Sequence, residues 1–255
     1  MNKIIVNMLQ QLTEKKKKLD NFKPFPIELV ENLDEWYKIE LTYTSNAIEG
    51  NTLTRQETAM VVEKGLTVEG KTLDEHLEAV NHAKAVSFIK KLLADKKTRK
   101  EITESDILEI HRIILSGIND AYAGRYRNIA VRIAGSRVVL PNPVRVPELM
   151  GDFMEWLRGD NQEHTIKIAA DAHFKLVSIH PFVDGNGRTA RLLMNLILTQ
   201  AGYPPAIIKT ENRKFYINAI EKGQLTGSMD DYYKIIYEAV DKSLDIYLDA
   251  LEKSR

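Results

Sequence analysis

The chain has 255 residues, enough for one large domain, and its 44% apolar and 28% charged residues are ordinary for a globular protein. Basic and acidic residues number 36 each, so no charge excess favours nucleic acid or an anionic membrane as a partner. The absence of cysteine excludes disulfides and thiolate metal sites, and no run reaches the roughly 18 apolar residues that a membrane span needs. We expect a cytoplasmic protein that binds neither nucleic acid nor membrane.

Apolar residues recur at helical spacing through most of the chain. The segments with this period are 27–48, 73–93, 107–115, 166–179 and 192–198. Helix starts are predicted at Pro26, at Thr72 with Glu75, and at Thr103 with Asp106, the last two pairs as capping boxes. Helix ends are predicted at five glycines: Gly50, Gly65, Gly117, Gly202 and Gly223. These signals predict an all-α fold.

One stretch has a different pattern. Residues 128–133 and 137–140 are β-prone, and Ala134, Gly135 and Ser136 lie between them. The prolines that follow would end a strand: Pro141, Pro143 and Pro147. We therefore expect a small β-hairpin flap on the helical core.

Residues 65–72 match the P-loop pattern of two glycines followed by lysine and threonine. A true P-loop follows a buried strand, but the preceding segment, 55–64, is polar at both ends and is better explained as a short helix. Thr72 is already accounted for as a helix cap. We expect no phosphate site at residues 65–72.

The segment 180–191 concentrates groups suited to phosphate chemistry. Pro181 ends the predicted helix that carries His180, and the glycines of the loop 185–187 allow backbone N–H groups to converge at the start of the next helix, near Arg188. A helix N-terminus of this kind attracts anions. His180, with an ordinary pKa of about 6.5, suits a general base.

Three charged side chains complete this segment. Arg188 and Arg191 are three residues apart, so they share one face of the helix and can reach the same anion. Asp184 offers the hard oxygen that Mg²⁺ prefers. A histidine, an acid, an anion cradle and two arginines within twelve residues indicate phosphate-transfer chemistry.

The order His-Pro-Phe-x-Asp-Gly-Asn-Gly-Arg-x-x-Arg in residues 180–191 resembles the signature of the Fic (filamentation induced by cAMP) family at every specified position. Residues 124–127 with the hairpin after them look like the family's flap, and residues 150–157 look like the helix that follows it. The resemblance covers roughly residues 40–225. We expect an N-terminal helical segment over 1–40 and a Fic domain over 41–255, with its core near 100–225.

The resemblance implies a protein adenylyltransferase, which moves AMP from ATP to a Ser, Thr or Tyr hydroxyl of a target protein. His180 would deprotonate the hydroxyl, and Asp184 would hold Mg²⁺ or Mn²⁺ on the phosphates. The residues implied to bind the α-, β- and γ-phosphates are Gly185, Asn186, Gly187, Arg188 and Arg191.

The resemblance also implies two further surfaces. The flap residues would cover the nucleotide and align a strand of the target protein: Ile133, Ala134, Gly135 and Ser136. The adenine would lie against Tyr216, Ile220 and Gln224, although an aromatic residue at helical spacing is more often part of a core. Self-association, common in the family, stays open because no surface patch is readable in the sequence.

A second motif, Ser45-Asn46-Ala47-Ile48-Glu49-Gly50, resembles the family's inhibitory pattern of Ser or Thr and Glu before Gly or Asn. Taken alone, Glu49 is a solvated helix end. The resemblance implies an inhibitory helix near 40–50 in which Glu49 pairs with Arg191.

Three other functions stay open at this point. Fic-type phosphotransferases typically carry Ala and Lys where this chain has Gly185 and Gly187, so the glycines favour AMP transfer. In some relatives the inhibitory glutamate instead serves to remove AMP from proteins. A nucleotide-responsive binding module without turnover is a third function, but it would need neither His180 nor Asp184.

Overall fold

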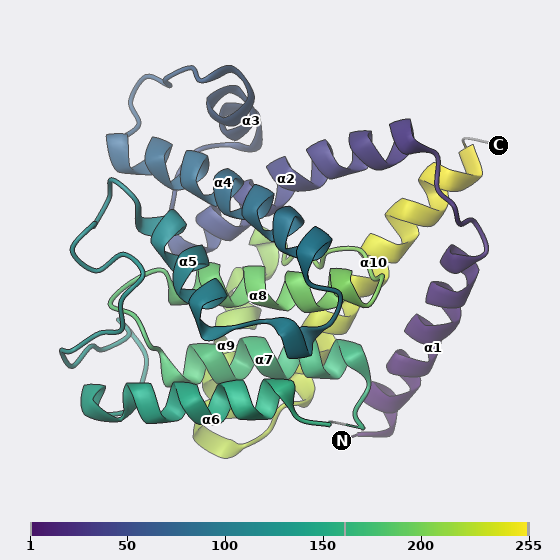
Figure 1. The fold of residues 1–255 in the computed structure, drawn as a ribbon. Coiled ribbons are helices and arrows are strands. Elements are labelled where there is room, and N and C mark those ends of the chain that lie inside the picture. Colours follow the sequence, from purple (N-terminus) through teal and green to yellow (C-terminus); the bar gives the residue numbers. More distant parts are fainter. Residues whose placement is uncertain (1, 161, 254–255) are drawn as a thin grey trace.

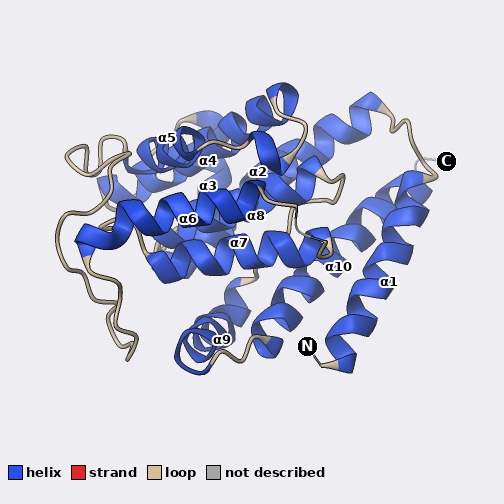
Figure 2. Cartoon of the chain, turned by 60° about the horizontal axis from the view of Figure 1, so that its bottom comes forward, coloured by secondary structure: helices blue, strands red, loops and turns tan. Residues whose placement is uncertain are grey.

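The computed structural model describes residues 2–160 and 162–253 (Figure 1). This part of the chain consists of α-helices, short 3-10 helices and loops, without any strand (Figure 2). The α-helices are α1 (Lys3–Asp20), α2 (Ile27–Glu49), α3 (Arg55–Lys64), α4 (Leu73–Asp95), α5 (Glu104–Leu115), α6 (Val146–Arg158), α7 (Thr165–Ile179), α8 (Asn186–Gln200), α9 (Arg213–Thr226) and α10 (Asp230–Lys253). The 3-10 helices are η1 (Arg99–Glu101), η2 (Pro143–Arg145) and η3 (Thr210–Asn212).

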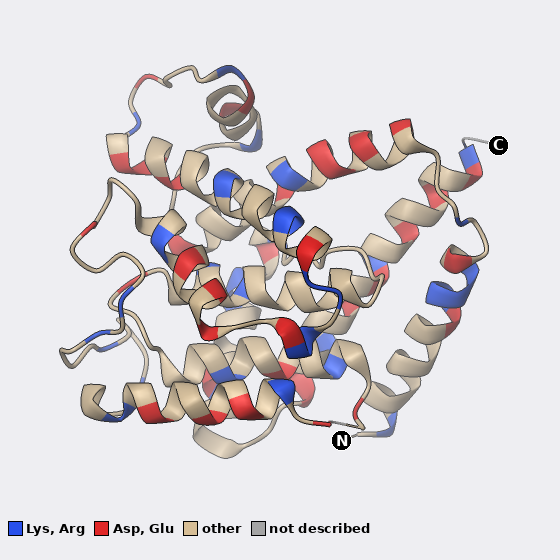
Figure 3. Ribbon diagram, viewed as in Figure 1, with Lys and Arg blue, Asp and Glu red and all other residues tan. Residues whose placement is uncertain are grey.

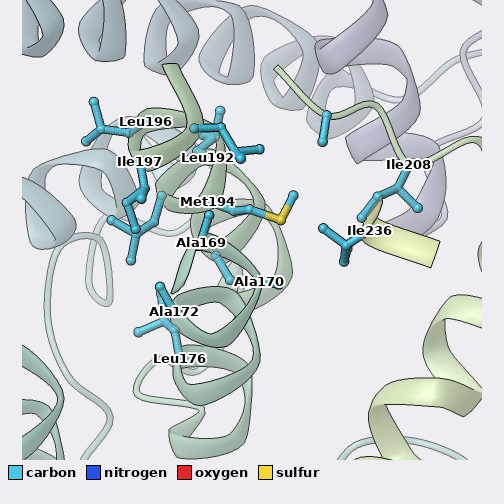
Figure 4. Packing of buried hydrophobic residues seen from close by; sticks show 14 of the residues in the cluster. Ala169, Ala170, Ala172, Leu176, Leu192, Met194, Leu196, Ile197, Ile208 and Ile236 are labelled. Carbon is cyan, nitrogen blue, oxygen red and sulfur yellow. The ribbon is translucent and has the colours of Figure 1, made fainter. Parts of the chain in front are cut away.

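Helices α7 and α8 lie side by side at the centre of the molecule (Figure 1). Three fully buried alanines on α7 allow close approach of the larger side chains of α8, as the close-up of the core shows (Figure 4): Ala169, Ala170 and Ala172. Helices α4 and α5 pack against α8, α6 packs against α7, and α2 contacts both α4 and α8. The loop that joins α7 to α8, which carries the signature, is therefore supported from several sides.

Helix α1 packs against α10. The buried face of α1 is formed by Ile5, Leu9, Leu12 and Leu19. Lys15, from a run of four lysines, forms ion pairs with Asp241 at 2.5 Å and Asp245 at 2.7 Å. Helix α2 then continues through position 40 without a break.

Most of the predicted helix signals are confirmed. All five periodic segments lie within α-helices, and both predicted capping boxes are present at the starts of α4 and α5. Residues 65–72 form the loop between α3 and α4, with Thr72 as the cap of α4 and no strand before it. Helix α8 begins at Asn186, slightly before the expected position near Arg188.

The predicted helix end at Gly223 is wrong. Helix α9 continues through this residue to Thr226, and its C-cap is Gly227, which has φ +74°. A Cβ atom at position 223 would lie 2.8 Å from the ring of Phe174 and 2.9 Å from the sulfur of Met229. Glycine at 223 thus permits close packing of the helix instead of ending it.

The predicted β-hairpin over residues 128–140 is also wrong. This segment belongs to the long loop between α5 and α6, at the left of Figure 1, and its one backbone–backbone hydrogen bond is a turn from Ser136 N–H to Ile133 O at 3.1 Å. Two features account for the absence of a ladder. The Arg127 guanidinium binds the carbonyl oxygens of Ile129 at 3.1 Å, near the start of the segment, and of Pro141 at 2.6 Å, just after its end. Val139 is 93% exposed, so the apolar burial that would stabilise an isolated pair of strands is missing.

The charged and apolar residues are distributed as the composition predicts. Basic and acidic side chains are interspersed over the helices (Figure 3). Within the described residues, no helix combines the length and the apolar character that crossing a bilayer requires.

Candidate active site

His180 follows the last residue of α7 in a left-handed conformation, with φ 51° and ψ 59°, and no other non-glycine residue in the described chain has positive φ. The neighbouring backbone holds this conformation. Its N–H donates to Leu176 O at 2.9 Å, and Arg127 Nε donates to its carbonyl oxygen at 2.8 Å. Strained backbone of this kind persists where surrounding contacts fix it, most often at functional sites.

The His180 imidazole is neutral near pH 7. Burial lowers its pKa below the ordinary value of 6.5, and the contact of Nδ1 with Val177 O at 3.4 Å, which favours the charged form, does not reverse this shift. The same contact favours the tautomer with the proton on Nδ1, so that Nε2 keeps its lone pair. A neutral ring with a basic Nε2 is the form that a general base requires.

The loop after His180 ends in a helix N-terminus. Gly185, with φ +74°, precedes α8, and the first amides of the helix have no acceptors within it. The Asn186 side chain is buried and faces inward, where it exchanges two hydrogen bonds of 2.9 Å with the backbone of Phe182. Asn186 can therefore offer an anion its backbone N–H, while its side chain fixes the shape of the loop.

His111 on α5, which belongs to neither sequence motif, supports this loop through its ring. Its Nδ1 accepts from Gly124 N–H at 3.0 Å, so its Nε2 carries the proton and donates to Asp184 O at 3.0 Å. The ring stacks on Phe182 with centroids 3.6 Å apart, and burial lowers its pKa to about 4. A Cβ atom at Gly185 would come within 3.3 Å of this ring. A lone polar residue on the buried face of a helix was the only signal in the sequence.

Asp184 is the candidate metal ligand. Its side chain is 63% exposed, one oxygen accepts from Gly185 N–H at 2.6 Å, and the other lies 3.2 Å from Arg188 Nη2. The described residues contain no group of three or more His, Asp or Glu side chains placed to hold a metal. Mg²⁺ is commonly held by one or two carboxylates together with substrate phosphates and water, so a single exposed carboxylate beside an anion cradle fits an ion that enters with a nucleotide.

Arg188 is almost fully buried, with 2% of its surface exposed. Its Nη1 donates to Glu78 Oε1 on α4 at 2.8 Å, and its Nη2 faces Asp184. Glu78 belongs to neither sequence motif, and no local pattern distinguishes it from the other acidic residues of α4.

Arg191 is held by the end of α2. Its Nε and Nη2 donate to the hydroxyl and carbonyl oxygens of Ser45 at 2.9 and 3.0 Å, and Nη2 also donates to Glu49 Oε1 at 2.6 Å. The structure thus brings together the two motifs that the sequence singled out. The Glu49 carboxylate lies directly over Gly187, where a Cβ atom would collide with it. A carboxylate therefore stands at the anion cradle.

Tyr216 lies behind Arg191 in the core. Its buried hydroxyl interacts with the Arg191 guanidinium and donates to His173 Nε2 at 2.6 Å. Burial lowers the pKa of His173 to about 3, so the neutral ring donates from Nδ1 to the Tyr232 hydroxyl at 2.9 Å, which in turn donates to Ala170 O at 2.8 Å. This buried chain of hydrogen bonds gives Arg191 a support in addition to Ser45 and Glu49.

The other residues predicted for the adenine side lie further along α9. Ile220 is partly buried against the core, and Gln224 donates to Ser178 Oγ at 3.2 Å. The flap residues 133–136 lie near the protein surface, and the next residue, Arg137, donates its backbone N–H to Glu221 on α9 at 2.9 Å. The loop and α9 are thus connected, as an enclosed nucleotide site between them would require.

Comparison with known proteins gives a consistent result. The Fic/DOC family model matches residues 101–198. A protein adenylyltransferase Fic from Nematostella vectensis is 37% identical over 243 residues, which cover 94% of this chain and 56% of the relative. Another, from Drosophila grimshawi, is 41% identical over 208 residues, covering 81% of this chain and 42% of the relative. The chain thus spans about half the length of these curated relatives.

Two solved structures share the whole architecture. Fic-1 (aa134–508) from C. elegans has a TM-score of 0.87 and 33% identity, covering 99% of this chain and 74% of that one. A Fic domain containing signaling protein from Bacteroides thetaiotaomicron has a TM-score of 0.81 and 28% identity, covering 96% of this chain and 98% of that one. Because the similarity to Fic-1 extends over almost every residue described above, and not over the signature alone, this chain belongs to the Fic family.

Proposed function

We propose that this chain is a protein adenylyltransferase that transfers AMP from ATP to a hydroxyl side chain of a target protein, and that Glu49 holds it in an inactive state. The observation that carries the proposal is the placement of a neutral His180 beside the N-terminus of α8, with Asp184 and two arginines around the same anion cradle. The names of the curated relatives support the same reaction.

The proposed reaction is a single displacement at the α-phosphorus. His180 Nε2 accepts the proton of the target hydroxyl, and the hydroxyl oxygen forms a bond to the α-phosphorus. The bond between the α-phosphorus and the oxygen leading to the β-phosphate breaks, and pyrophosphate leaves with those electrons. The amides at the start of α8 stabilise the charge that develops on the α-phosphate oxygens, and Arg188 and Arg191 bind the phosphates that leave.

Asp184 is the residue proposed to hold Mg²⁺ or Mn²⁺. When bound, such an ion supplies positive charge to the α- and β-phosphate oxygens as a Lewis acid. The exposure of the Asp184 carboxylate suits this function, because a nucleotide and its ion can arrive together from solvent.

Glu49 is proposed to keep the enzyme inactive by occupying the place of the γ-phosphate. Its carboxylate binds Arg191 and lies over Gly187, so a triphosphate in the same place would meet negative charge and lose its arginine. Any ATP that binds would therefore do so in a pose that does not permit transfer.

The flap is proposed as the docking site of the target protein. Apart from the turn at Ser136, residues 133–136 make no backbone–backbone hydrogen bond within the described structure, so their N–H and C=O groups are available to an extended segment of a partner. Ile220 and Gln224 are proposed to line the adenine side; the hydrogen bond between Arg137 and Glu221, which lies between them on α9, supports this proposal.

Removal of AMP is a second candidate function, because the Glu49 carboxylate lies at the cradle, where it could orient a water molecule. Phosphotransfer is less well supported, since Gly185 and Gly187 both have close neighbours in the space that larger side chains would occupy.

Incubation of the Glu49→Gly variant with ATP and a cell lysate, followed by intact-protein mass spectrometry, tests these functions. A gain of one AMP supports adenylyl transfer, and a gain of one phosphate would replace it with phosphotransfer. Loss of AMP from modified protein when wild type is added supports removal. The control combines Glu49→Gly with His180→Ala, which should cut transfer about 100-fold or more while ATP still binds.

A further inference from the structure

Glu78 on α4 stands between the anion cradle and the helix that carries Glu49. Each of its carboxylate oxygens has a different partner. Oε1 accepts from Arg188 Nη1 at 2.8 Å, and Oε2 accepts from Asn51 Nδ2 at 2.8 Å. One side chain thus joins a phosphate-binding arginine to the residue that follows the C-cap of α2.

The Asn51 bond is part of a wider attachment of α2 to α4. Gly50, with φ +109°, ends α2, and Asn51 N–H donates back to Asn46 O at 3.1 Å. The Asn51 amide also donates to Glu75 O at 3.0 Å, and the Asn46 amide donates to Glu78 O at 3.1 Å. Two amide side chains therefore fasten the last turn of α2, the turn that presents Glu49, to the first two turns of α4.

The second hydrogen bond of Glu78 holds Arg188 in place; below, the links from Glu78 to Asn51 and to Arg188 are called the α2 arm and the Arg188 arm. Arg188 is too deeply buried for water to solvate its guanidinium well, and a buried charge without a partner is strongly destabilising. Glu78, whose side chain is 20% exposed, supplies a compensating charge and a defined hydrogen-bond direction, while the other carboxylate near Arg188, Asp184 at 3.2 Å, is 63% exposed. The guanidinium is thus held at the base of the cradle before any nucleotide binds.

We propose that Glu78 is a positioning residue that couples the two states of the enzyme. Through Asn51 it holds the end of α2 so that Glu49 stays on Arg191, and through Arg188 it keeps the cradle ready for phosphates. The inference rests on the proposed function, because it explains what maintains the inactive state and what sets the affinity for ATP.

The α2 arm is tested with Asn51→Ala, which removes the amide donor and leaves the Glu78–Arg188 pair in place. The substitution also removes the bonds of the Asn51 side chain to Glu75 O and to Leu53 N–H. We expect AMP transfer to rise at least about fivefold, because these bonds hold the end of α2 in the inactive state. Asn51→Ala should cause no rise when Glu49→Gly is already present, because the inhibitory carboxylate is then absent. The matched control is Asn21→Ala, at the exposed end of α1, where the described structure shows no side-chain hydrogen bond. A rate equal to that of wild type, or an equal rise in the Glu49→Gly background, would overturn this arm.

The Arg188 arm is tested in the Glu49→Gly background by comparing Glu78→Ala with Glu78→Gln. We expect Glu78→Ala to raise the KM for ATP about tenfold with kcat changed less than twofold, and Glu78→Gln to recover part of the loss, because its amide oxygen still accepts from Arg188. A KM that is the same in all three proteins would overturn the arm.

Hydrogen–deuterium exchange separates failure of the inference from failure of the proposed function. Asn51→Ala should speed exchange in residues 45–51 and leave α8 unchanged, whatever reaction the protein catalyses. Unchanged exchange there would overturn the inference even if Glu49→Gly transfers AMP. If Glu49→Gly transfers no AMP while exchange responds as expected, the proposed function fails and the attachment through Asn51 stands.

Discussion

Replacement of Glu49 by glycine should release Arg191 and raise the rate of AMP transfer. The magnitude follows from the ion pair, in which Arg191 Nη2 and Glu49 Oε1 are 2.6 Å apart. A hydrogen bond to a charged group contributes about 1.5–3 kcal/mol net. The lower half of that range applies, because the Glu49 side chain is 36% exposed and water screens the pair. About 1.5–2 kcal/mol corresponds to a rise of about 10- to 30-fold.

The assay measures incorporation of AMP labelled at the α-phosphate into the enzyme itself and into lysate proteins, for wild type and Glu49→Gly side by side. Glu49→Gln is the matched control, since it keeps the shape and one hydrogen bond but removes the charge, and it should fall between the two. Arg191→Ala should not mimic the activation, because the arginine itself binds the γ-phosphate. If wild type and Glu49→Gly agree within twofold, Glu49 does not inhibit the enzyme and the reasoning fails.

Three further predictions use the Glu49→Gly background. Chelation by EDTA, or Asp184→Ala, should abolish transfer, and full activity without metal would refute the assignment of Asp184. Transfer should fall as the pH drops through the pKa of His180, which burial lowers below its ordinary value of 6.5, since protonation removes the base; an apparent pKa above 6.5 in the pH–rate profile would contradict this. Tyr216→Phe should raise the KM for ATP about fivefold and weaken ADP binding less, because it removes a support of Arg191; a ring that only stacks on adenine predicts no change for either nucleotide.

The parts of the site that follow from local sequence were the predictable ones. The order of residues in 180–191 places His180 at a helix end and a glycine loop before α8, because proline and glycine act on the backbone where they stand. The capping boxes at Thr72 and Thr103 were readable for the same reason. The Glu49 motif was recognisable only through its resemblance to the family, because nothing local distinguishes it from an ordinary helix end.

The parts that depend on tertiary contacts were not predictable. Glu78 and His111 act on residues 110 and 73 positions away, and neither lies in a pattern that sets it apart from its neighbours. The hairpin prediction at 128–140 failed because the segment is held from outside by Arg127 and buries little apolar surface, with Val139 93% exposed. A glycine at position 223 is typical of a helix end. The structure instead requires glycine there because Phe174 and Met229 pack too closely for a side chain.

The partners of Arg191 have a practical consequence for the design of expression fragments. The region matched by the family model, 101–198, contains this arginine, but Ser45 and Glu49 precede the region and Tyr216 follows it. A fragment trimmed to the matched region would leave the guanidinium without these contacts, and it would also strip α4 and α10 from the apolar surfaces that they cover. Boundaries for crystallisation or for fusion proteins should therefore keep the whole span from α1 to α10.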